Sequence, residues 1–475
     1  MQFNSLVFVI FFLVILGIHY LPLPTLVRRC NLLVASYLYY AAWNPRYIPL
    51  LFFVTSTNWW AAKWINRLEG VWSRRTVLWG NIALNLGLLG AFKYGNEGIA
   101  LWSTVATRLG IPAPLVSPSI LLPVGLSFFT FQALSYTIDV YRRTLRPASS
   151  ALDFSIFVSF FPVLLAGPLL RAGPFLPACC RPRRATPEEL GWGAALFTLG
   201  LFMKVVLADQ FLFPVVRKVF DSQVSPTALA GWMGTMAFAG QDYCDFAGYS
   251  TCAMGLAACL GFTVPENFRA PLSSIGFRDL WQRWHITLVA WMRDYVFLSL
   301  GGVYKGYSRA ALNVMIVMIL IGLWHGAAWT YLIFGMLHGV YLIGEVLLLR
   351  TPLRRMRLWS NAAGSFLLWT ATMFLCCIAF VFYRTPDLRD AGRLLVAMFG
   401  MSSQGHSTAL DDYEILVVSV VLESLIAVHA LRRHLGLSEV VAKLPWWAIA
   451  SGLGLMLYAI TLSSGEATTY LYFNY

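Results

Sequence analysis

The chain has 475 residues, of which 58% are hydrophobic and 12% carry a formal charge, and its mean hydropathy is +0.66. Soluble domains carry about 25% charged residues, so this composition excludes a water-exposed surface over most of the chain and requires lipid as the solvent for much of it. The net charge of +13 does not indicate nucleic-acid binding, because basic residues such as Arg28, Arg29, Arg142 and Arg143 lie in short loops between apolar runs.

Apolar runs of membrane-spanning length recur along the chain and predict an all-α, polytopic integral membrane protein. A spanning helix needs about 17 to 25 mostly apolar residues. The expected spans lie near residues 3–20, 32–54, 77–93, 119–140, 154–170, 190–208, 228–262, 310–328, 329–349, 362–383, 413–431 and 445–463. The run 228–262 is long enough for two passes, so we expect about 11–13 transmembrane or re-entrant helices in a single membrane domain over residues 1–475. The first run lacks the features of a cleaved signal peptide, which favours a retained span.

The loops set the expected orientation of the chain in the membrane. Arg28 and Arg29 follow the first expected span, and Arg432 and Arg433 follow the penultimate one, which places both loops inside the cell. The tail 463–475 has one acidic residue and no basic ones. Both termini are therefore expected outside.

Several catalytic patterns are absent from the sequence. The eight cysteines show no CxxC and no paired metal-ligand spacing, so we expect neither a disulfide framework nor a metal site. No HExxH, P-loop or GxGxxG pattern occurs, which argues against a zinc hydrolase, an ATP-driven pump and a dinucleotide enzyme. The glycine that would complete a nucleophile elbow around Ser250 is missing.

The segment Ser273–Leu300 is too charged to be an ordinary lipid-facing span. At helical spacing its large apolar side chains form one stripe, comprising Trp281, Trp284, Leu288, Trp291 and Tyr295. This pattern favours a partly buried or interfacial helix. Arg283 and Arg293 lie off the stripe beside His285, where they can either bind an anion or only extend to lipid head groups. Asp294 is about half a turn out of phase with His285, so an Arg293–Asp294 pair is favoured over a His285–Asp294 pair.

His325 is the strongest single candidate for chemistry. It lies between Arg309 and Arg350, a run whose only formally charged residue is Glu345. The run predicts two spans with both ends inside, and His325 near the far end of the first. Burial disfavours the imidazolium, so a neutral His325 can accept a proton from a hydroxyl; the alternative is a histidine that only hydrogen-bonds between helices. His338 is off the helical face of His325 and is expected to pack.

The chain ends in an aromatic hexapeptide, Tyr470 to Tyr475. One interpretation is an aromatic belt at the outer membrane interface, and physical chemistry favours it. The other is a phenolic hydroxyl that receives an acyl group.

Several long motifs together resemble the signature of the membrane-bound O-acyltransferases (MBOATs), in the branch of the bacterial alginate and cellulose O-acetyltransferase membrane component. The signature lies in Trp281–Leu288, Trp291–Tyr295 and Leu300–Gly302, and Gly322–Trp329 resembles the segment that carries the family's invariant histidine. Further matches occur at Trp43–Pro45, Leu121–Tyr141, Gly167–Pro168, Gln241–Tyr249 and Pro265–Phe268. The chain departs from the family at Thr287 or Ala290, where serine is frequent, and at Cys244.

The resemblance implies an MBOAT fold around a tunnel and an acetyl relay for O-acetylation of an exported polysaccharide, alginate or cellulose. It implies His325 as general base and His285 as its companion, which orients the thioester or stabilises its oxyanion. Arg283, Arg293, Asp294 and Trp324 are kept as supporting or substrate-binding candidates. The C-terminal hexapeptide is similar to a Phe-x-Tyr-Phe-x-Phe ending of this branch, and matching by position selects Tyr472 as the acyl-relay candidate.

The same resemblance implies the partners and the location. Acetyl-CoA is the expected acyl donor and no cofactor is expected to stay bound. The expected partners are a periplasmic SGNH-type acetyltransferase, the exopolysaccharide biosynthesis complex and the lipid bilayer, in a bacterial inner membrane with both termini periplasmic. The alternatives are D-alanyl or other acyl transfer to a cell-envelope polymer, and a polytopic transporter without a covalent step.

Overall fold

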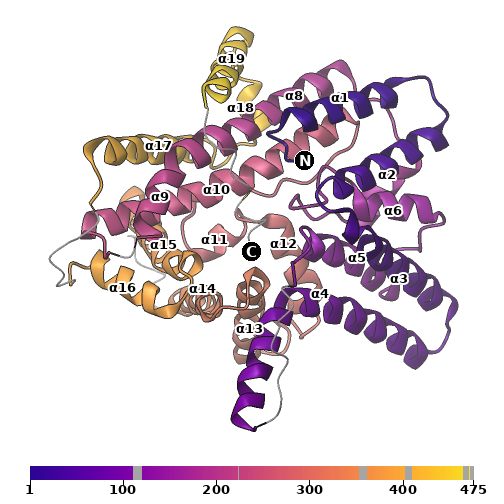
Figure 1. The fold of residues 1–475 in the computed structure, drawn as a ribbon, viewed down its shortest axis with the longest axis horizontal. Helices are drawn as coiled ribbons and strands as arrows, with labels where there is room; N and C mark the ends of the chain where they lie inside the picture. Colours follow the sequence, from indigo (N-terminus) through magenta and orange to yellow (C-terminus); the bar gives the residue numbers. More distant parts are fainter. Residues whose placement is uncertain (111–119, 223, 352–360, 402–408, 464–469, 471–475) are drawn as a thin grey trace. The chain divides into compact units, whose positions relative to one another are not determined.

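The computed structural model describes residues 1–110, 120–222, 224–351, 361–401, 409–463 and Tyr470. All regular secondary structure in these ranges is helical, which confirms the predicted all-α class (Figure 1). The chain divides into two compact units, residues 1–194 with 253–265 and residues 195–252 with 266–475. The single membrane domain expected over residues 1–475 stays a prediction.

The first unit is built from the N-terminal helices. They are α1 (Leu6–Tyr20), α2 (Thr25–Ala41), the short η1 (Pro45–Tyr47), α3 (Ile48–Arg67), α4 (Val71–Arg108), α5 (Leu126–Tyr141), α6 (Ala151–Ser159) and α7 (Ala172–Cys180). Helices α3, α4 and α5 pack against one another (Figure 1). Between them Asn81 donates to Asn58 at 2.8 Å, and Asn58 donates to Asn85 at 2.9 Å. These buried amides satisfy one another and fix α3 against α4.

The second unit contains the remaining helices, and two of its helices also continue into the first. They are α8 (Pro187–Phe202), the π-helix η2 (Met203–Leu212), α9 (Phe213–Phe220), α10 (Ala228–Cys259), η3 (Pro271–Ser273), α11 (Phe277–Trp281), α12 (Ile286–Met292), η4 (Arg293–Phe297), α13 (Tyr307–His325), α14 (Trp329–Leu348), α15 (Ala362–Arg384), α16 (Leu388–Met398), α17 (Asp412–Leu431), α18 (Leu437–Val441) and α19 (Trp446–Leu462). The continuous helix Pro187–Phe220 and α10 both cross the division between the units.

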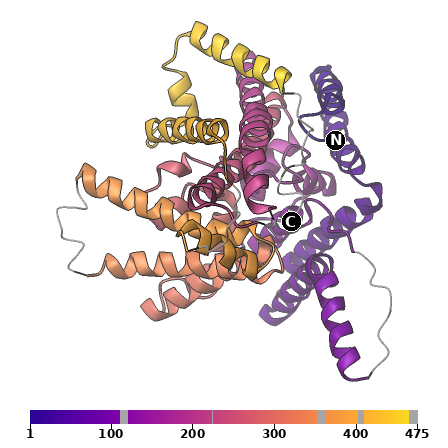
Figure 2. The same ribbon diagram turned by 60° about the vertical axis from the view of Figure 1, so that its left-hand side comes forward.

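Helices α13 and α14 form a tight antiparallel hairpin, and α15 packs beside α14 (Figure 2). Glycines allow the close approach. A methyl group at Gly335 on α14 would clash with the carbonyl oxygen of Met318 on α13, and one at Gly322 would clash with that of Tyr331. The hairpin therefore brings the end of α13, where His325 lies, firmly against α14.

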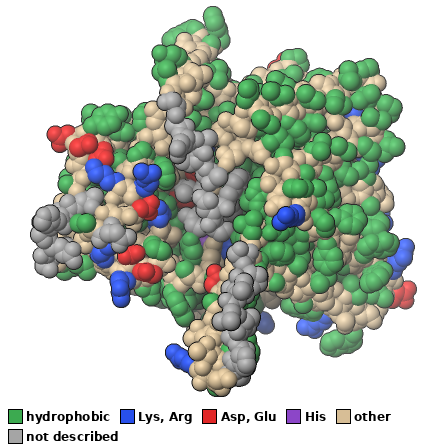
Figure 3. Space-filling view, viewed as in Figure 1, with side chains coloured by type: hydrophobic (Ala, Val, Ile, Leu, Met, Phe, Trp, Pro, Cys, Tyr) green, Lys and Arg blue, Asp and Glu red, His purple; other side chains and the backbone are tan. Residues whose placement is uncertain are grey.

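Five helices in the described ranges are long and apolar enough to cross a membrane: Pro187–Phe220, α13, α14, α15 and α17. They coincide with five of the expected spans, and the shorter apolar helices α1 and α19 coincide with two more. Figure 3 shows hydrophobic side chains covering most of the visible surface of the first unit, over α1, α2 and α3. Leu6 on α1 and Trp72 on α4 are both more than two-thirds exposed, as expected of a lipid-facing surface. The multi-pass prediction is confirmed.

Four expected runs differ from the structure. The expected span 32–54 is divided between α2, which ends at Ala41, and α3, which begins at Ile48. The run 228–262, long enough for two passes, forms the single helix α10, and the first residue of the run with a positive φ is Gly261. The expected span 154–170 is helical only to Ser159, since Pro162 and Pro168 cannot continue a helix. The segment Ser273–Leu300 is not one helix: it breaks at His285, whose φ of 45° lies in the left-handed region.

Candidate active site

A cavity of about 320 Å³ within the second unit is lined by both predicted histidines, His285 and His325. Its walls come from α10, α13, α14, α15, α17 and the segment 271–288. Along α15 the lining runs from Trp369 to Tyr383, and 14 residues of helix rise about 21 Å, against about 30 Å for the hydrocarbon core of a bilayer. The cavity is therefore elongated along the helix.

The lining is mostly apolar and carries few polar groups. Besides the two predicted histidines, the charged or imidazole side chains that line it are Asp242 on α10, His338 on α14 and Glu423 on α17. His338 was expected only to pack. It is buried, and its ring packs edge-on against Trp281 and Phe334 with centroids 5.2 and 4.7 Å away, so it packs and also faces the cavity. Few polar groups in an apolar cleft are typical of a ligand site.

His325 is the last residue of α13 and is held by a tyrosine. Its Nδ1 lies 3.2 Å from the hydroxyl of Tyr383 at the end of α15, and the two rings meet edge to face at 4.8 Å. Gly326 follows in extended backbone, and a side chain there would clash with the Tyr331 ring. The turn from α13 to α14 therefore requires a glycine at position 326, because any side chain there would meet the Tyr331 ring.

His285 is almost completely buried, with 2% of its surface exposed. Its Nδ1 lies 3.2 Å from the Oδ1 of Asn267, and the edge of its ring meets Phe246 at 4.7 Å. Burial lowers the pKa of the His285 imidazole to about 3, because taking a cation out of water is costly. His285 is therefore neutral at physiological pH.

Trp324 brings the two histidines into one site. Its indole lies 5.6 Å from the ring of His285 and 4.9 Å from that of His325. Trp324 is buried, and it contacts both imidazoles at once. Its role as a supporting residue stays a prediction.

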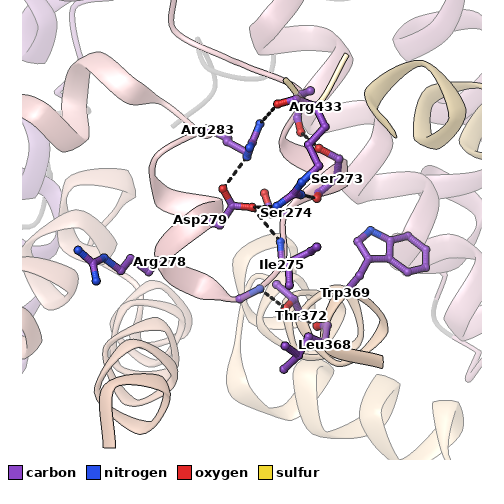
Figure 4. Close-up of polar contacts among 12 residues, drawn as sticks. Ser273, Ser274, Ile275, Arg278, Asp279, Arg283, Leu368, Trp369, Thr372 and Arg433 are labelled. Carbon is purple, nitrogen blue, oxygen red and sulfur yellow. Dashed lines mark hydrogen bonds and ion pairs between the residues drawn. The ribbon is translucent and has the colours of Figure 1, made fainter. Parts of the chain in front are cut away.

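None of the four supporting candidates, Trp324 included, lines the cavity. Arg283 donates to Asp279 at 2.7 Å, and Arg433 donates to the same carboxylate at 2.8 Å (Figure 4). Burial alone would raise the pKa of the Asp279 carboxyl. The hydrogen bond from the Ile275 amide and the two guanidinium groups lower that pKa by more than burial raises it, so the net pKa lies below its ordinary value. Arg283 and Arg433 therefore both pair with Asp279 in a structural cluster.

Arg293 and Asp294 pair with each other at 2.8 Å, as the helical phase predicted. The Arg293 side chain is 63% exposed, so this pair lies at the surface. The structure therefore brings Trp324 to the two histidines, and it leaves Arg283, Arg293 and Asp294 outside the cavity lining.

The segment that carries His285 is fixed by side chains from later helices (Figure 4). Trp369 donates to the carbonyl of Leu272 at 2.7 Å, and Thr372 accepts from the amide of Gly276 at 2.9 Å. Glu345, the one carboxylate of the α13–α14 run, accepts from the amides of Phe277 and Arg278 at 2.6 and 3.0 Å. It thereby satisfies N–H groups at the start of α11 that have no partner inside the helix.

Tyr472, the acyl-relay candidate, lies outside the described residues. Tyr470, two residues earlier, is buried. The Nζ of Lys204 lies 4.8 Å from the centroid of its ring, and Tyr249 packs perpendicular to it at 5.0 Å. Lys204 is itself paired with Asp209 at 2.9 Å and with Asp245. At Tyr470 the C-terminal tail is thus docked in the second unit.

Two site residues escaped the sequence reasoning. Tyr383 directly precedes Arg384 at the end of an apolar run, which is the usual pattern of an interfacial anchor. Asn267 belongs to the Pro265–Phe268 motif, so a signal was present, but its contact with His285 spans 18 positions and follows no helical spacing.

Comparison with known proteins identifies the family. Residues 125–385 match the membrane-bound O-acyltransferase family, MBOAT. The chain is 37% identical over 403 residues to the probable alginate O-acetylase AlgI of Pseudomonas putida, covering 84% of this chain and 80% of that protein. It is 35% identical over 446 residues to the probable alginate O-acetylase AlgI of Azotobacter vinelandii, covering 91% and 85%. It is 29% identical over 443 residues to the peptidoglycan O-acetyltransferase of Helicobacter pylori, covering 84% and 80%.

The chain therefore belongs to the MBOAT family, as its motifs predicted. It is an acyltransferase, embedded in a membrane by several spans. The alternative of a transporter without a covalent step is set aside by this assignment. The family region ends at residue 385, so it includes His285, His325 and Tyr383.

Proposed function

We propose that the protein transfers acetyl groups from acetyl-CoA, presented on the cytoplasmic side, through the inner membrane for O-acetylation of an exported polysaccharide, with His325 as general base. The observation that carries the proposal is that His325 and His285 line one elongated, mostly apolar cavity within an MBOAT chain. The similarity to proteins named alginate O-acetylase supports alginate as the polymer and an exopolysaccharide pathway as the context; cellulose is the other polymer proposed.

The chemistry follows from the groups in the cavity. A neutral His325 takes the proton of an acceptor hydroxyl while the hydroxyl oxygen attacks the thioester carbonyl. The new C–O bond forms, the C–S bond breaks, and the proton passes from the imidazole to the departing sulfur. An apolar cavity excludes water, which would otherwise hydrolyse the thioester. His285 orients the substrates beside it.

The acceptor is proposed to lie on the periplasmic side. Tyr472, in the tail that is docked through Tyr470, or a serine of an SGNH-type partner receives the acetyl group, and the partner then passes it to the polysaccharide. This route requires periplasmic termini, as the basic loops predict. No cofactor is needed besides the donor, since the imidazoles supply the acid–base chemistry.

The deciding experiment measures thiol release from acetyl-CoA by the purified protein with its periplasmic partner present. The His325→Ala variant should lose about 100-fold or more of this rate, because general-base catalysis contributes about 10²–10⁴-fold. The protein level and thermal unfolding of the variant are measured in parallel. A His325→Ala protein that releases thiol and acetylates polymer at the normal rate would rule out the mechanism.

The relay is tested separately with Tyr472→Phe. If mass spectrometry finds no acetyl group on a tail peptide of the active protein, and Tyr472→Phe acetylates the partner normally, then the acetyl group passes directly to the partner and the relay part of the proposal is wrong.

A further inference from the structure

The orientation of the Asn267 amide is fixed by its neighbours. The backbone N–H of Thr287 donates to Asn267 Oδ1 at 3.2 Å, and the hydroxyl of Thr287 donates to the same oxygen at 2.9 Å. A backbone N–H is always a donor, so the atom that faces Thr287 must be the amide oxygen. The amide nitrogen points the other way, toward the hydroxyl of Ser250 at 3.4 Å.

This orientation determines which nitrogen of His285 carries the proton. Asn267 Oδ1 lies 3.2 Å from His285 Nδ1, and an amide oxygen only accepts hydrogen bonds. Nδ1 is therefore the donor, and a neutral imidazole with its proton on Nδ1 has a lone pair on Nε2. Since burial keeps His285 neutral, its Nε2 is a hydrogen-bond acceptor and not a donor.

Two backbone hydrogen bonds hold the chain on either side of the contact between Asn267 and His285. The amide of Ile286 donates to the carbonyl of Asn267 at 2.9 Å, and the amide of Arg269 donates to the carbonyl of Arg283 at 2.9 Å. These two bonds tie residues 267–269 to the turn at His285, where φ is 45°. Asn267 itself is 1% exposed, so its oxygen is shielded from bulk water.

We infer that Asn267 is a positioning residue that holds His285 in the Nδ1–H form, so that His285 presents Nε2 to the cavity as an acceptor for an O–H or N–H group of a substrate. This role deepens the proposed function and rests on it. It excludes donation from a neutral His285 to the thioester oxyanion, one of the two roles that the family resemblance left open for this residue. The two sources of such a donor group are the acceptor hydroxyl and the amides of the acetyl-CoA arm.

Two substitutions at Asn267 separate positioning from a merely structural role. Asn267→Ala removes the acceptor of the Nδ1 proton, and thiol release from acetyl-CoA should fall at least about tenfold, since the wrong tautomer of an active-site histidine is severely damaging. Asn267→Asp keeps an acceptor at the same place and should restore part of the activity. The carboxylate also stabilises the imidazolium, so this variant should lose activity on acidification at a higher pH than the unmodified protein does.

The control is Asn313→Asp, which makes the same change at a buried asparagine of the same unit. Asn313 on α13 donates to the carbonyls of Leu300 and Gly302 and does not line the cavity. Its pH profile should keep the unmodified shape. The other titratable groups that line the cavity are unchanged in all three variants: Asp242, His325, His338 and Glu423.

The KM for acetyl-CoA identifies the donor group. If Asn267→Ala has a raised KM for acetyl-CoA, the group that donates to His285 is an amide of the acetyl-CoA arm. If its KM is unchanged, its turnover to the acceptor is lower and Asn267→Asp has the shifted pH profile, the donor is the acceptor hydroxyl. Nitrogen NMR of histidine-labelled protein reports the tautomer without any activity. A proton found on Nε2 of His285, or pH profiles and rates that are the same in all variants, would overturn the inference. Its failure is distinct from failure of the proposed function, which only an active His325→Ala protein would show.

Discussion

The indole of Trp324 packs against the imidazole of His285 with their centroids 5.6 Å apart, although the two residues are 39 positions apart in the chain. Because Trp324 also precedes His325 and contacts its ring, it sets the separation of the two imidazoles.

Trp324→Ala should leave a void between the histidines. Loss of a buried aromatic side chain costs about 3–5 kcal/mol, so the variant should unfold at a lower temperature and lose thiol release. Trp324→Phe keeps an aromatic ring in place and should retain most of the stability. If thermal unfolding of the two variants is indistinguishable from that of the unmodified protein, Trp324 does not separate the imidazoles as the structure indicates.

Tyr383→Phe should slow the reaction without unfolding the protein. The change removes the hydroxyl that lies 3.2 Å from His325 Nδ1 and keeps the ring. A hydrogen bond of this kind is worth about 0.5–1.5 kcal/mol, or more if the imidazole becomes charged, so turnover should fall about two- to tenfold. Tyr341→Phe on α14 is the matched control, because Tyr341 stacks on Phe277 and does not line the cavity. Equal turnover in both variants would show that the Tyr383 hydroxyl has no role.

Gly335→Ala should disrupt the α13–α14 hairpin. The added methyl group would meet the backbone of Met318 and Ile319 on α13, and neither can move aside without parting the helices. Overpacking of this kind costs about 1–3 kcal/mol or more. Gly344→Ala on the same helix is the control, because its methyl group would meet nothing. The amounts of monodisperse protein after detergent extraction should differ clearly, and equal yields would contradict the close approach at Gly335.

Asp279 predicts a pH-dependent contribution to stability. Its folded-state pKa is lowered, so its stabilising effect is complete above the unfolded-state pKa of about 4 and disappears as the pH falls through the lower folded-state value. Asp279→Asn should therefore unfold at a lower temperature than the unmodified protein near neutral pH. The difference should vanish in strong acid.

Asp294→Asn supplies the comparison for Asp279. Its partner Arg293 is largely exposed, and such surface pairs are worth about 0–1 kcal/mol. A loss of stability in Asp294→Asn as large as that in Asp279→Asn would contradict the difference between the two sites.

The sequence predicted the helical spans and the two histidines for physical reasons that act locally. A long apolar run has no alternative in lipid to a helix, so α13, α14, α15 and α17 lie close to their expected positions. His325 places an ionisable side chain within such a run, which is why the sequence singles it out as a candidate. The break at His285 was not foreseen, because its aromatic stripe continues at helical spacing on both sides of the residue. Helix α11 ends at Trp281, and the turn before α12 is held by hydrogen bonds to residues 267–269. Contacts of this kind leave no periodic signal.

The anchors of the histidine-bearing segment also fix an order of events during synthesis. Residues 271–283 leave the ribosome first, yet the groups that hold them, Glu345, Thr372, His429 and Arg433, all follow in later spans. Residues 272–279 can therefore gain these contacts only after α14, α15 and α17 have been made. A chain that ends before α17 would contain both histidines and would lack the contacts of His429 and Arg433 with the segment that precedes His285.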